Sequence, residues 1–507
     1  MPSINRRTAL GGGLASVAVL KLSPAKGARQ VQPEFSLGVA SGCPRPESIV
    51  LWTRLVFPET PADPFSFTPL EQQEYAPCEV EWTLARDAAL TDVVQRGTTV
   101  ASADFGHSVH VEIDRLTPAT TYYYGFSCNG AASRIGRTKT APTANAETRV
   151  RFAFASCQHF EQGFYAAYRD MAAREIDFVL HLGDYIYEGG SRSGKVRSHE
   201  AGIPTTLDEY RARYKTYKSD ADLQAAHAAF PWLVIWDDHE VVDNYHSTSA
   251  PTATNEPHFL TRRQAAYQAW YEHMPVPPHL APDFRNLRIH DHFAFGSMLD
   301  LLLLDARQYR SHVAANLAEA AQSQRTMFGS EQEKWLEERL SQAHAKWTLL
   351  AQPTLLSERI GGYGREKDIL DGWDGYQVAR RRLMTMIDKA ALRNVVLLGG
   401  DLHSYYAAQI PETFDMPAAK PLATEFVVGS ITSNGPSQAA LDKALSANPR
   451  LRFGRGGAHG YALATLTQDR CIVEFVAVSD KNDPEATVEV FATFTIKDGI
   501  SAIEISK

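Results

Sequence analysis

Five apolar runs in this chain end abruptly in side chains that commonly bind metal ions. In chain order, the residues that follow these runs are Cys157, Asp184, Asp238 with His239, Asp305, and Asp401 with His403. Thiolate, carboxylate and imidazole together suit a transition metal such as iron or zinc, whereas an all-oxygen set suits calcium, magnesium or manganese. The residue types and their order therefore predict one polynuclear metal site.

Asp184 is the residue best placed to serve two cations at once. It follows Gly183 at the end of an apolar run, and a glycine there allows close approach of the backbone. We expect Asp184 to bridge the cations, with Cys157 as a thiolate ligand of one of them. Asp401 and an Asn would complete an all-oxygen subsite for the other.

The predicted cations would act on phosphate esters. Two cations about 3.5–4 Å apart bind both non-bridging oxygens of a phosphate and lower the pKa of a bound water. In-line attack by a metal-held hydroxide or oxide, without a phosphoenzyme, is then the natural reaction. His239, next to a carboxylate, is predicted to be the general acid. Arg307 is predicted to donate two hydrogen bonds to phosphate oxygens.

Several side chains near these motifs have alternative roles. His181 lies inside an apolar run and is predicted to belong to the core or to support a ligand. Asp305 can serve the site directly or orient a neighbour such as Arg307. Asp237 is expected to support the site and Asp238 to bind metal, although spacing does not separate adjacent residues on a tight turn.

The apolar runs are the elements that must position this site. They cover residues 152–155, 178–182, 232–236, 301–304 and 395–398. Runs that are apolar on both faces and separated by helix-length segments predict buried strands of an α/β fold. In such sheets ligands gather beyond the carboxyl ends of the strands, where these polar residues fall. We assign this catalytic domain to residues 149–507.

An all-β domain is predicted to precede it, over residues 33–142. Segments 48–55, 78–85 and 108–113 alternate between apolar and polar residues, with turn residues between them. Segment 116–124 resembles the tyrosine corner of a fibronectin-type-III sandwich. The small, proline-containing stretch 141–146 marks the boundary between the two domains.

Composition gives little reason to expect a nucleic-acid partner. The 507 residues exceed what one core usually holds, and 44% apolar with 22% charged residues is typical of a soluble globular protein. The net charge of −8 argues against specific nucleic-acid binding, and small phosphate esters are the expected substrates.

The first thirty residues have the pattern of a twin-arginine export signal. Arg6-Arg7 precedes a weakly apolar stretch, 10–22, and a small-residue segment, 23–28. The stretch is too short for a transmembrane span, so we expect no membrane anchor. The sequence predicts a signal at residues 1–30, the twin-arginine machinery as an export partner, and a periplasmic or secreted protein.

Five cysteines make an odd count, which needs a reason in an oxidising compartment. Cys43, Cys78 and Cys128 lie within the first 130 residues, where one disulfide can form, and the sequence does not choose the pair. Cys157, at a strand end beside carboxylate motifs, is the candidate metal ligand.

The chain resembles the PhoD-type alkaline phosphatases and phosphodiesterases of the calcineurin-like metallophosphoesterase superfamily. The resemblance spans the whole chain and rests on five ordered motifs, at residues 154–157, 181–188, 236–240, 304–310 and 400–403. It implies a β-sandwich core flanked by helices, preceded by a small fibronectin-III-like all-β domain. It also implies hydrolysis of phosphate monoesters and diesters at alkaline pH.

The same resemblance implies a ligand set. Its Fe(III) ligands would be Cys157, Asp184, Tyr187 and His403, the tyrosinate giving a charge-transfer colour. One or two calcium ions would lie with Asp184, Asp401 and Asn244, and zinc, manganese or magnesium can replace these metals. Relatives usually have Asn directly before the motif histidine, where this chain has Asp238, so Asp238 and Asn244 compete for that role.

Two other functions stay open at this point. One is a phosphodiesterase dedicated to phospholipids, wall polymers or nucleotides, whose site need not accept a third anionic oxygen. The other is a non-catalytic cell-surface module, in which the sandwich binds a wall partner and the metals only brace the fold.

Overall fold

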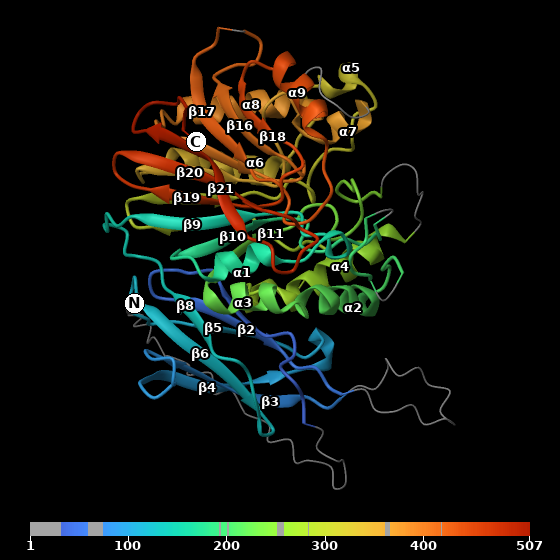
Figure 1. Cartoon of the computed structure of the whole chain (residues 1–507), viewed down its shortest axis with the longest axis vertical. Helices are drawn as coiled ribbons and strands as arrows, with labels where there is room; N and C mark the ends of the chain where they lie inside the picture. Colours follow the sequence, from blue (N-terminus) through green and yellow to red (C-terminus); the bar gives the residue numbers. More distant parts are fainter. Residues whose placement is uncertain are drawn as a thin grey trace, which may run out of the picture.

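The computed structural model describes residues 32–58, 75–191, 194–199, 202–250, 258–281, 283–359, 366–416 and 418–506. Two large β-sheets stack on each other, and the larger one continues into the lower part of the molecule, where its N-terminal strands lie beside a third sheet (Figure 1). The predicted export signal, at residues 1–30, lies outside the described residues and stays a prediction.

The larger sheet has ten strands, and three of its four parallel neighbours lie at its centre. These three are β9 (Val150–Ala155), β10 (Phe178–Leu182) and β11 (Pro231–Ile235). Beyond β9 follow β19 (Gly460–Leu466), β20 (Arg470–Val478), β21 (Val488–Lys497) and β22 (Glu504–Ser506). Beyond β11 follow β1 (Val39–Gly42), β2 (Ile49–Arg54) and β5 (Ser108–Ile113).

The second sheet has seven strands, four of them parallel neighbours. The parallel strands are β13 (Leu299–Leu303), β14 (Trp347–Ala351), β15 (Val395–Gly399) and β17 (Pro421–Val427). Antiparallel strands complete the sheet: β12 (Asp291–Phe295), β16 (Tyr405–Pro411) and β18 (Leu451–Arg455). The five predicted apolar runs are therefore confirmed as strands, divided between two sheets.

Both faces of the second sheet are buried, which explains its unbroken apolar runs. Leu301 and Leu303 face the core shared with β9 to β11. Leu302 and Leu304 face the opposite way, into a second core with α6 (Gly329–Ser341) and α8 (Gln377–Lys389). Successive strand residues point to opposite faces, so a strand covered on both sides needs apolar residues throughout.

Helices cover the outer sides of the two sheets (Figure 1). In the lower half of Figure 1 lie α1 (Ala166–Ala172), α2 (Leu207–Lys218), α3 (Ala221–Ala229) and α4 (Phe259–His273). Near the top lie α5 (Leu317–Ala320), α7 (Glu366–Asp371) and α9 (Gln438–Ala447). Within the described ranges, none of these helices has both the length and the apolar character that a membrane crossing requires.

The N-terminal strands form a sandwich of their own. A third sheet of five strands contains β3 (Cys78–Ala85), β4 (Val93–Ala101), β6 (Thr121–Cys128), β7 (Ala131–Ala132) and β8 (Gly136–Lys139). It shares an apolar core with β1, β2 and β5. The Thr117 N–H donates to the Tyr122 hydroxyl over 2.9 Å, which confirms the tyrosine corner.

The sandwich is joined to the central sheet through β1. Ser41 and Gly42 pair in parallel with Pro231 and Trp232 of β11, so one continuous sheet runs from the N-terminal strands to β22. The predicted division between residues 142 and 149 falls between β8 and β9. The division stays a prediction. Strands β1, β2 and β5 come before this boundary but belong to the same ten-stranded sheet as β9 to β11, so the sheet does not separate two domains there.

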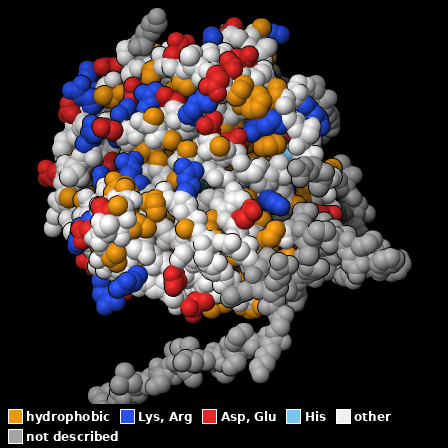
Figure 2. Space-filling model, turned by 60° about the horizontal axis from the view of Figure 1, so that its bottom comes forward, with side chains coloured by type: hydrophobic (Ala, Val, Ile, Leu, Met, Phe, Trp, Pro, Cys, Tyr) orange, Lys and Arg blue, Asp and Glu red, His pale blue; other side chains and the backbone are white. Residues whose placement is uncertain are grey.

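Charges of both signs are mixed on the visible surface. Figure 2 shows Lys and Arg side chains interspersed with Asp and Glu over the described part of one face. This face therefore offers no continuous basic surface of the kind that nucleic-acid backbones prefer. The prediction that nucleic acid is not a partner stays a prediction.

Candidate metal centre

The chain takes an unusual backbone conformation at five predicted ligands. The angle φ is +59° at Cys157, +55° at Asp184, +59° at Asn244, +63° at Asp401 and +51° at His403. Non-glycine residues rarely adopt this left-handed region, which costs about 1–3 kcal/mol for each residue and persists only where the surroundings enforce it. Such sites concentrate where function requires a fixed side-chain direction.

Two glycines allow the strand ends to approach each other. A Cβ atom on Gly183, where φ is +100°, would lie 2.5 Å from Asp237 Cβ. A Cβ atom on Gly400 would lie 2.5 Å from Ser156 Oγ. The close approach that the glycines permit is thus between neighbouring turns, and it brings the loop after β15 against the end of β9.

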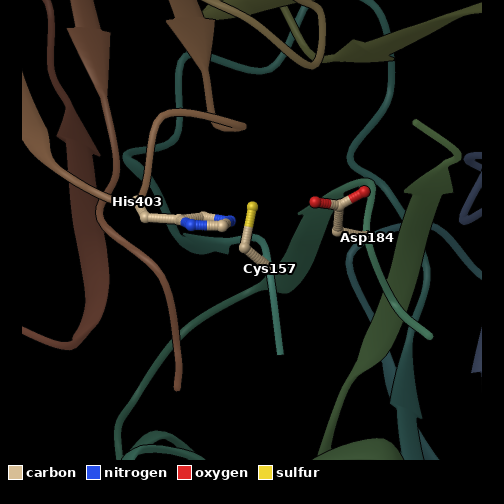
Figure 3. Close-up of side chains that lie close together, drawn as sticks. All are labelled: Cys157, Asp184 and His403. Carbon is tan, nitrogen blue, oxygen red and sulfur yellow. The ribbon is translucent and has the colours of Figure 1, made fainter. Parts of the chain in front are cut away.

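Three ligand types converge between the two sheets. The ligand atoms of Cys157, Asp184 and His403 all lie within 4.8 Å of one another, and Figure 3 shows the thiol between the imidazole and the carboxylate. Tyr187 joins them: its hydroxyl donates to Asp184 Oδ2 over 2.9 Å and lies 3.0 Å from His403 Nε2. The four residues that the resemblance assigns to iron therefore meet at one point.

Two further groups extend the site away from Cys157. One contains Asp184, Asp238 and His239, and the other contains Asp237, Asp238 and Asp401, with the same spacing limit of 4.8 Å. Asp184 belongs both to the group with Cys157 and His403 and to the group with His239. Asp238 belongs to the group with His239 and to the group with Asp401. Asp184 thus has the position that a bridging ligand requires.

The carboxylates of this site fit a cation. Asp237 Oδ2 and Asp238 Oδ1 are buried and have no hydrogen-bond partner among the described residues. Burial raises the pKa of Asp184 well above its ordinary value, and the charges of Asp238, Glu240 and Asp401 add to the effect. Clustered buried carboxylates are costly unless positive charge compensates them, and bound metal ions supply that charge.

The thiol and the phenol fit the same interpretation. Burial raises the pKa of Cys157 and of Tyr187 well above their ordinary values, and the charge of Asp184 adds to both shifts. Neither group would ionise in these surroundings without a cation beside it. A metal ion is the partner that deprotonates a coordinating thiol.

Asp238 and Asn244, the two candidates for one ligand position, lie on the same turn. The Asn244 N–H donates to Asp238 Oδ2. Although burial opposes it, the charges of Arg307 and His239 hold the pKa of Asp238 below its ordinary value. Asp238 thus offers a cation a carboxylate oxygen, whereas Asn244 offers a neutral amide oxygen. Which of the two is the ligand stays a prediction.

Arg307 is enclosed by carboxylates. Its guanidinium bonds Asp237 through Nε and Asp371 through Nη1 over 2.9 Å, and its Nη2 lies 3.5 Å from Asp238 Oδ1. The side chain is only 2% exposed. These contacts hold the two aspartates in place, and the predicted bond from Arg307 to phosphate oxygens stays a prediction.

Asp305 orients its neighbours. Its Oδ1 accepts the N–H of Arg307 over 2.9 Å, the N–H of Gln308 over 3.0 Å and the indole N–H of Trp236 over 3.2 Å. It belongs to none of the ligand groups found among the described residues. Of the two roles open to Asp305, the geometry favours the orienting one.

His239 is held by a buried carboxylate. Its Nδ1 lies 2.7 Å from Glu188 Oε2, and Glu188 Oε1 accepts the Asp243 N–H over 2.9 Å. Although burial opposes it, Glu188 and Asp184 raise the pKa of His239 well above its ordinary value. The imidazole is therefore oriented by Glu188 and 21% exposed, and its role as proton donor stays a prediction.

Sequence reasoning missed several residues that support the site. Glu240 accepts the N–H groups of Asp184 over 3.1 Å and Asp237 over 2.9 Å, which fixes both turns. Other residues that hold a predicted site residue include Glu188, Thr354, Asp371 and Ser433. Glu188 and Glu240 stand beside predicted ligands in the motifs and could have been found there, whereas the other three come from distant segments.

His181 lies in the core, as one of its predicted roles required. It is fully buried in β10 and packs on the Trp232 ring at 6.1 Å between centroids. It contributes no atom to the ligand groups in the described part of the chain.

Comparisons of sequence agree with this geometry. Residues 152–475 match the model of the family described as PhoD-like phosphatase, and residues 21–142 match that of the PhoD-like phosphatase N-terminal domain. The chain is 39% identical over 476 residues to alkaline phosphatase D of Bacillus subtilis (strain 168). That match covers 91% of this chain and 80% of the relative.

Solved structures agree as well. A structure of PhoD superposes with a TM-score of 0.86 at 37% identity, covering 96% of this chain and 94% of that one. Purple acid phosphatase PPD1 from yellow lupin superposes with a TM-score of 0.57 at 12% identity, covering 92% and 74%, a likeness of fold alone. The predicted metallophosphoesterase-type α/β core with an all-β N-terminal part is confirmed.

Proposed function

Because this chain belongs to the PhoD-like phosphatase family and is a phosphoric ester hydrolase, we propose that it is exported and depends on metal ions. Its reaction would be the hydrolysis of phosphate monoesters and diesters at alkaline pH. The observation that carries the metal dependence is a chain of three candidate ligand groups, in which Asp184 links the first to the second and Asp238 links the second to the third.

The ions we propose are Fe(III) and one or two Ca²⁺. Cys157, Asp184, Tyr187 and His403 would hold iron, since thiolate, phenolate and imidazole favour a transition metal. Asp184 and Asp401, with Asp238 or Asn244, would hold calcium through oxygen ligands, and zinc, manganese or magnesium remain alternatives. When bound, the cations supply positive charge for the phosphate oxygens and lower the pKa of water in the site.

The side chains would divide the remaining work. Glu188 would keep the proton on His239 Nδ1, so that Nε2 faces the ester and gives a proton to the leaving oxygen during in-line attack by hydroxide. Arg307 would hold Asp237 and Asp238 in register, and any contact it makes with phosphate would add to this role.

Initial rates on two model substrates test the function. Purified protein, with its metal content measured, is expected to hydrolyse both p-nitrophenyl phosphate and bis(p-nitrophenyl) phosphate at alkaline pH. A dedicated phosphodiesterase would hydrolyse only the diester. A metal-loaded protein that hydrolyses neither would contradict the proposal and favour the cell-surface module.

The substitution Cys157→Ser tests the identity of the metals. Because the thiolate favours iron, we expect the variant to lose iron and its visible charge-transfer absorption while keeping calcium. Cys471→Ser is the matched control, since Cys471 is a buried thiol of β20 that belongs to no ligand group among the described residues. Unchanged iron content in Cys157→Ser would refute the mixed-metal assignment.

Export is proposed from residues 1–30, where Arg6-Arg7 precedes the weakly apolar stretch. The partner during export would be the twin-arginine machinery, and the mature enzyme would act in the periplasm or outside the cell. Its substrates would be small phosphate esters.

A further inference from the structure

Three of the five cysteines have surroundings that account for them. Cys157 belongs to a candidate ligand group. Cys471 is 1% exposed in the core of β20, and the Cys43 thiol lies 3.9 Å from the Pro275 carbonyl oxygen. Cys78 and Cys128 remain, and both lie in the N-terminal sandwich, outside the metal centre.

The strand register brings Cys78 and Cys128 close together. β3 and β6 are antiparallel neighbours, and their ladder ends at the pair Glu81 and Ser127. One step further along the ladder places Cys128 opposite Val80, two residues from Cys78. Diagonal neighbours of this kind on one face lie about 7–8 Å apart, so a bond between the two sulfurs requires a small shift of the strand ends toward each other.

Both thiols point to the same face of the sheet. Cys78 alternates with Val80 and Leu84, and Cys128 alternates with Phe126. All five residues belong to, or pack against, the single apolar core of the N-terminal sandwich. The two thiols therefore share one side of the sheet and one environment.

The two thiols lie close enough to affect each other's ionisation. Burial raises the pKa of both, that of Cys128 to about 12, and the charge of Cys78 adds to the shift at Cys128. Cys78 is partly exposed, whereas Cys128 is 3% exposed. A soluble oxidant therefore reaches Cys78 first, and Cys128 stands next to the sulfur that has reacted.

We propose that Cys78 and Cys128 form a disulfide that closes the N-terminal sandwich. The Cys78 thiolate attacks one sulfur of a small disulfide such as oxidised glutathione, which releases one glutathione thiol. The Cys128 thiolate then attacks the Cys78 sulfur of the mixed disulfide and releases the second. Two protein thiols are oxidised, one external disulfide is reduced to two thiols, and the two protons pass to the released thiols.

This bond would link β3 to β6 and close the segment from residue 78 to residue 128. Closing a loop of that length restricts the unfolded chain and stabilises the folded one. Cys43, Cys157 and Cys471 would stay unpaired, and Cys157 would remain available to the metal centre.

Oxidation of the full chain with glutathione disulfide, followed by non-reducing peptide mapping, tests the proposal. We expect the intact mass to fall by two hydrogens, with one cross-linked peptide pair that carries Cys78 and Cys128. The midpoint of thermal unfolding should rise by about 2 °C or more and return to its starting value on reduction.

Two variants make the result specific. Cys43→Ser should form the same cross-link as the parent chain. Cys128→Ser should stop at the mixed disulfide and gain the mass of one glutathione on Cys78. A parent chain that also keeps a stable glutathione on Cys78, or that cross-links through Cys43 or Cys471, overturns the proposal.

Discussion

Replacing Asp184 by Asn is expected to lower kcat at least about 10³-fold while the fold stays intact. Asp184 belongs to two of the three candidate ligand groups, and its Oδ2 accepts the Tyr187 hydroxyl. An amide has the same shape as the carboxylate but carries no charge, so it cannot compensate two cations at once. Steady-state kinetics and metal analysis of the variant measure this effect.

The same substitution at Asp177 is the matched control. Asp177 lies just before the amino end of β10, the strand that Asp184 follows, and pairs with Lys139 over 2.6 Å. It is remote from every candidate ligand, so Asp177→Asn should keep the activity of the parent enzyme. Substantial turnover by a folded, metal-free Asp184→Asn variant would contradict the proposed role of Asp184.

A stability measurement separates lost chemistry from lost folding. Burial and neighbouring carboxylates raise the pKa of Asp184, so its ionised form is unfavourable in the metal-free protein. Metal-free Asp184→Asn should therefore unfold at the same temperature as the metal-free parent chain, or at a higher one. A large fall in that temperature would mean that the aspartate braces the fold.

Removing the metals with a chelator is expected to abolish hydrolysis while the secondary structure is retained. The two sheets have extensive apolar cores of their own, so the strands do not depend on the cations for their packing. Circular dichroism and activity, recorded on the same sample before and after metal is restored, measure both effects. Hydrolysis that survives complete metal removal would disprove metal dependence, and loss of secondary structure would favour the module braced by metals.

Metal removal should also increase the dependence of stability on pH. Burial raises the pKa of Glu240, beside the candidate ligands, from 4.5 to about 7. A group whose pKa is raised by folding stabilises the fold below its unfolded pKa, and this contribution is lost as pH rises through the folded value. The metal-free protein should therefore melt at a higher temperature near pH 5 than near pH 8.

Glu425 provides the control for this pH dependence. Burial raises its pKa from 4.5 to about 7 as well, but it lies on β17 and accepts the N–H groups of Leu356 and Ser357. Its contribution should be the same with and without metal. The part of the pH dependence that metal suppresses therefore reports on the centre itself, and equal slopes in both forms would contradict this explanation.

Much of this fold could be predicted from local patterns. The alternating segments at 48–55, 78–85 and 108–113 became β2, β3 and β5, although β2 is buried on both faces rather than on one. The tyrosine corner at Tyr122 was also visible, since its partner Thr117 is only five residues away. The pairing of β1 with β11 was not, because residues 41 and 231 share no local pattern.

The candidate site divides in the same way. Cys157, Asp184, Asp401 and His403 could be named because each follows a buried strand, and the carboxyl ends of such strands meet at one edge. The roles of Asp305 and Arg307 could not be predicted from the sequence. They depend on the bond from Arg307 to Asp371, which lies more than sixty residues further along the chain.

The sequence by itself determined which residue types stand at the strand ends, because strand period and glycine position act over a few residues. Only the tertiary structure decided which of those side chains meet. Glu188 bonds His239, and Ser433 bonds Tyr187, although each pair is far apart in the sequence. The pairing of β3 with β6 likewise places Cys78 near Cys128. Such contacts depend on how the sheets pack as a whole, because packing brings distant segments within reach of one another.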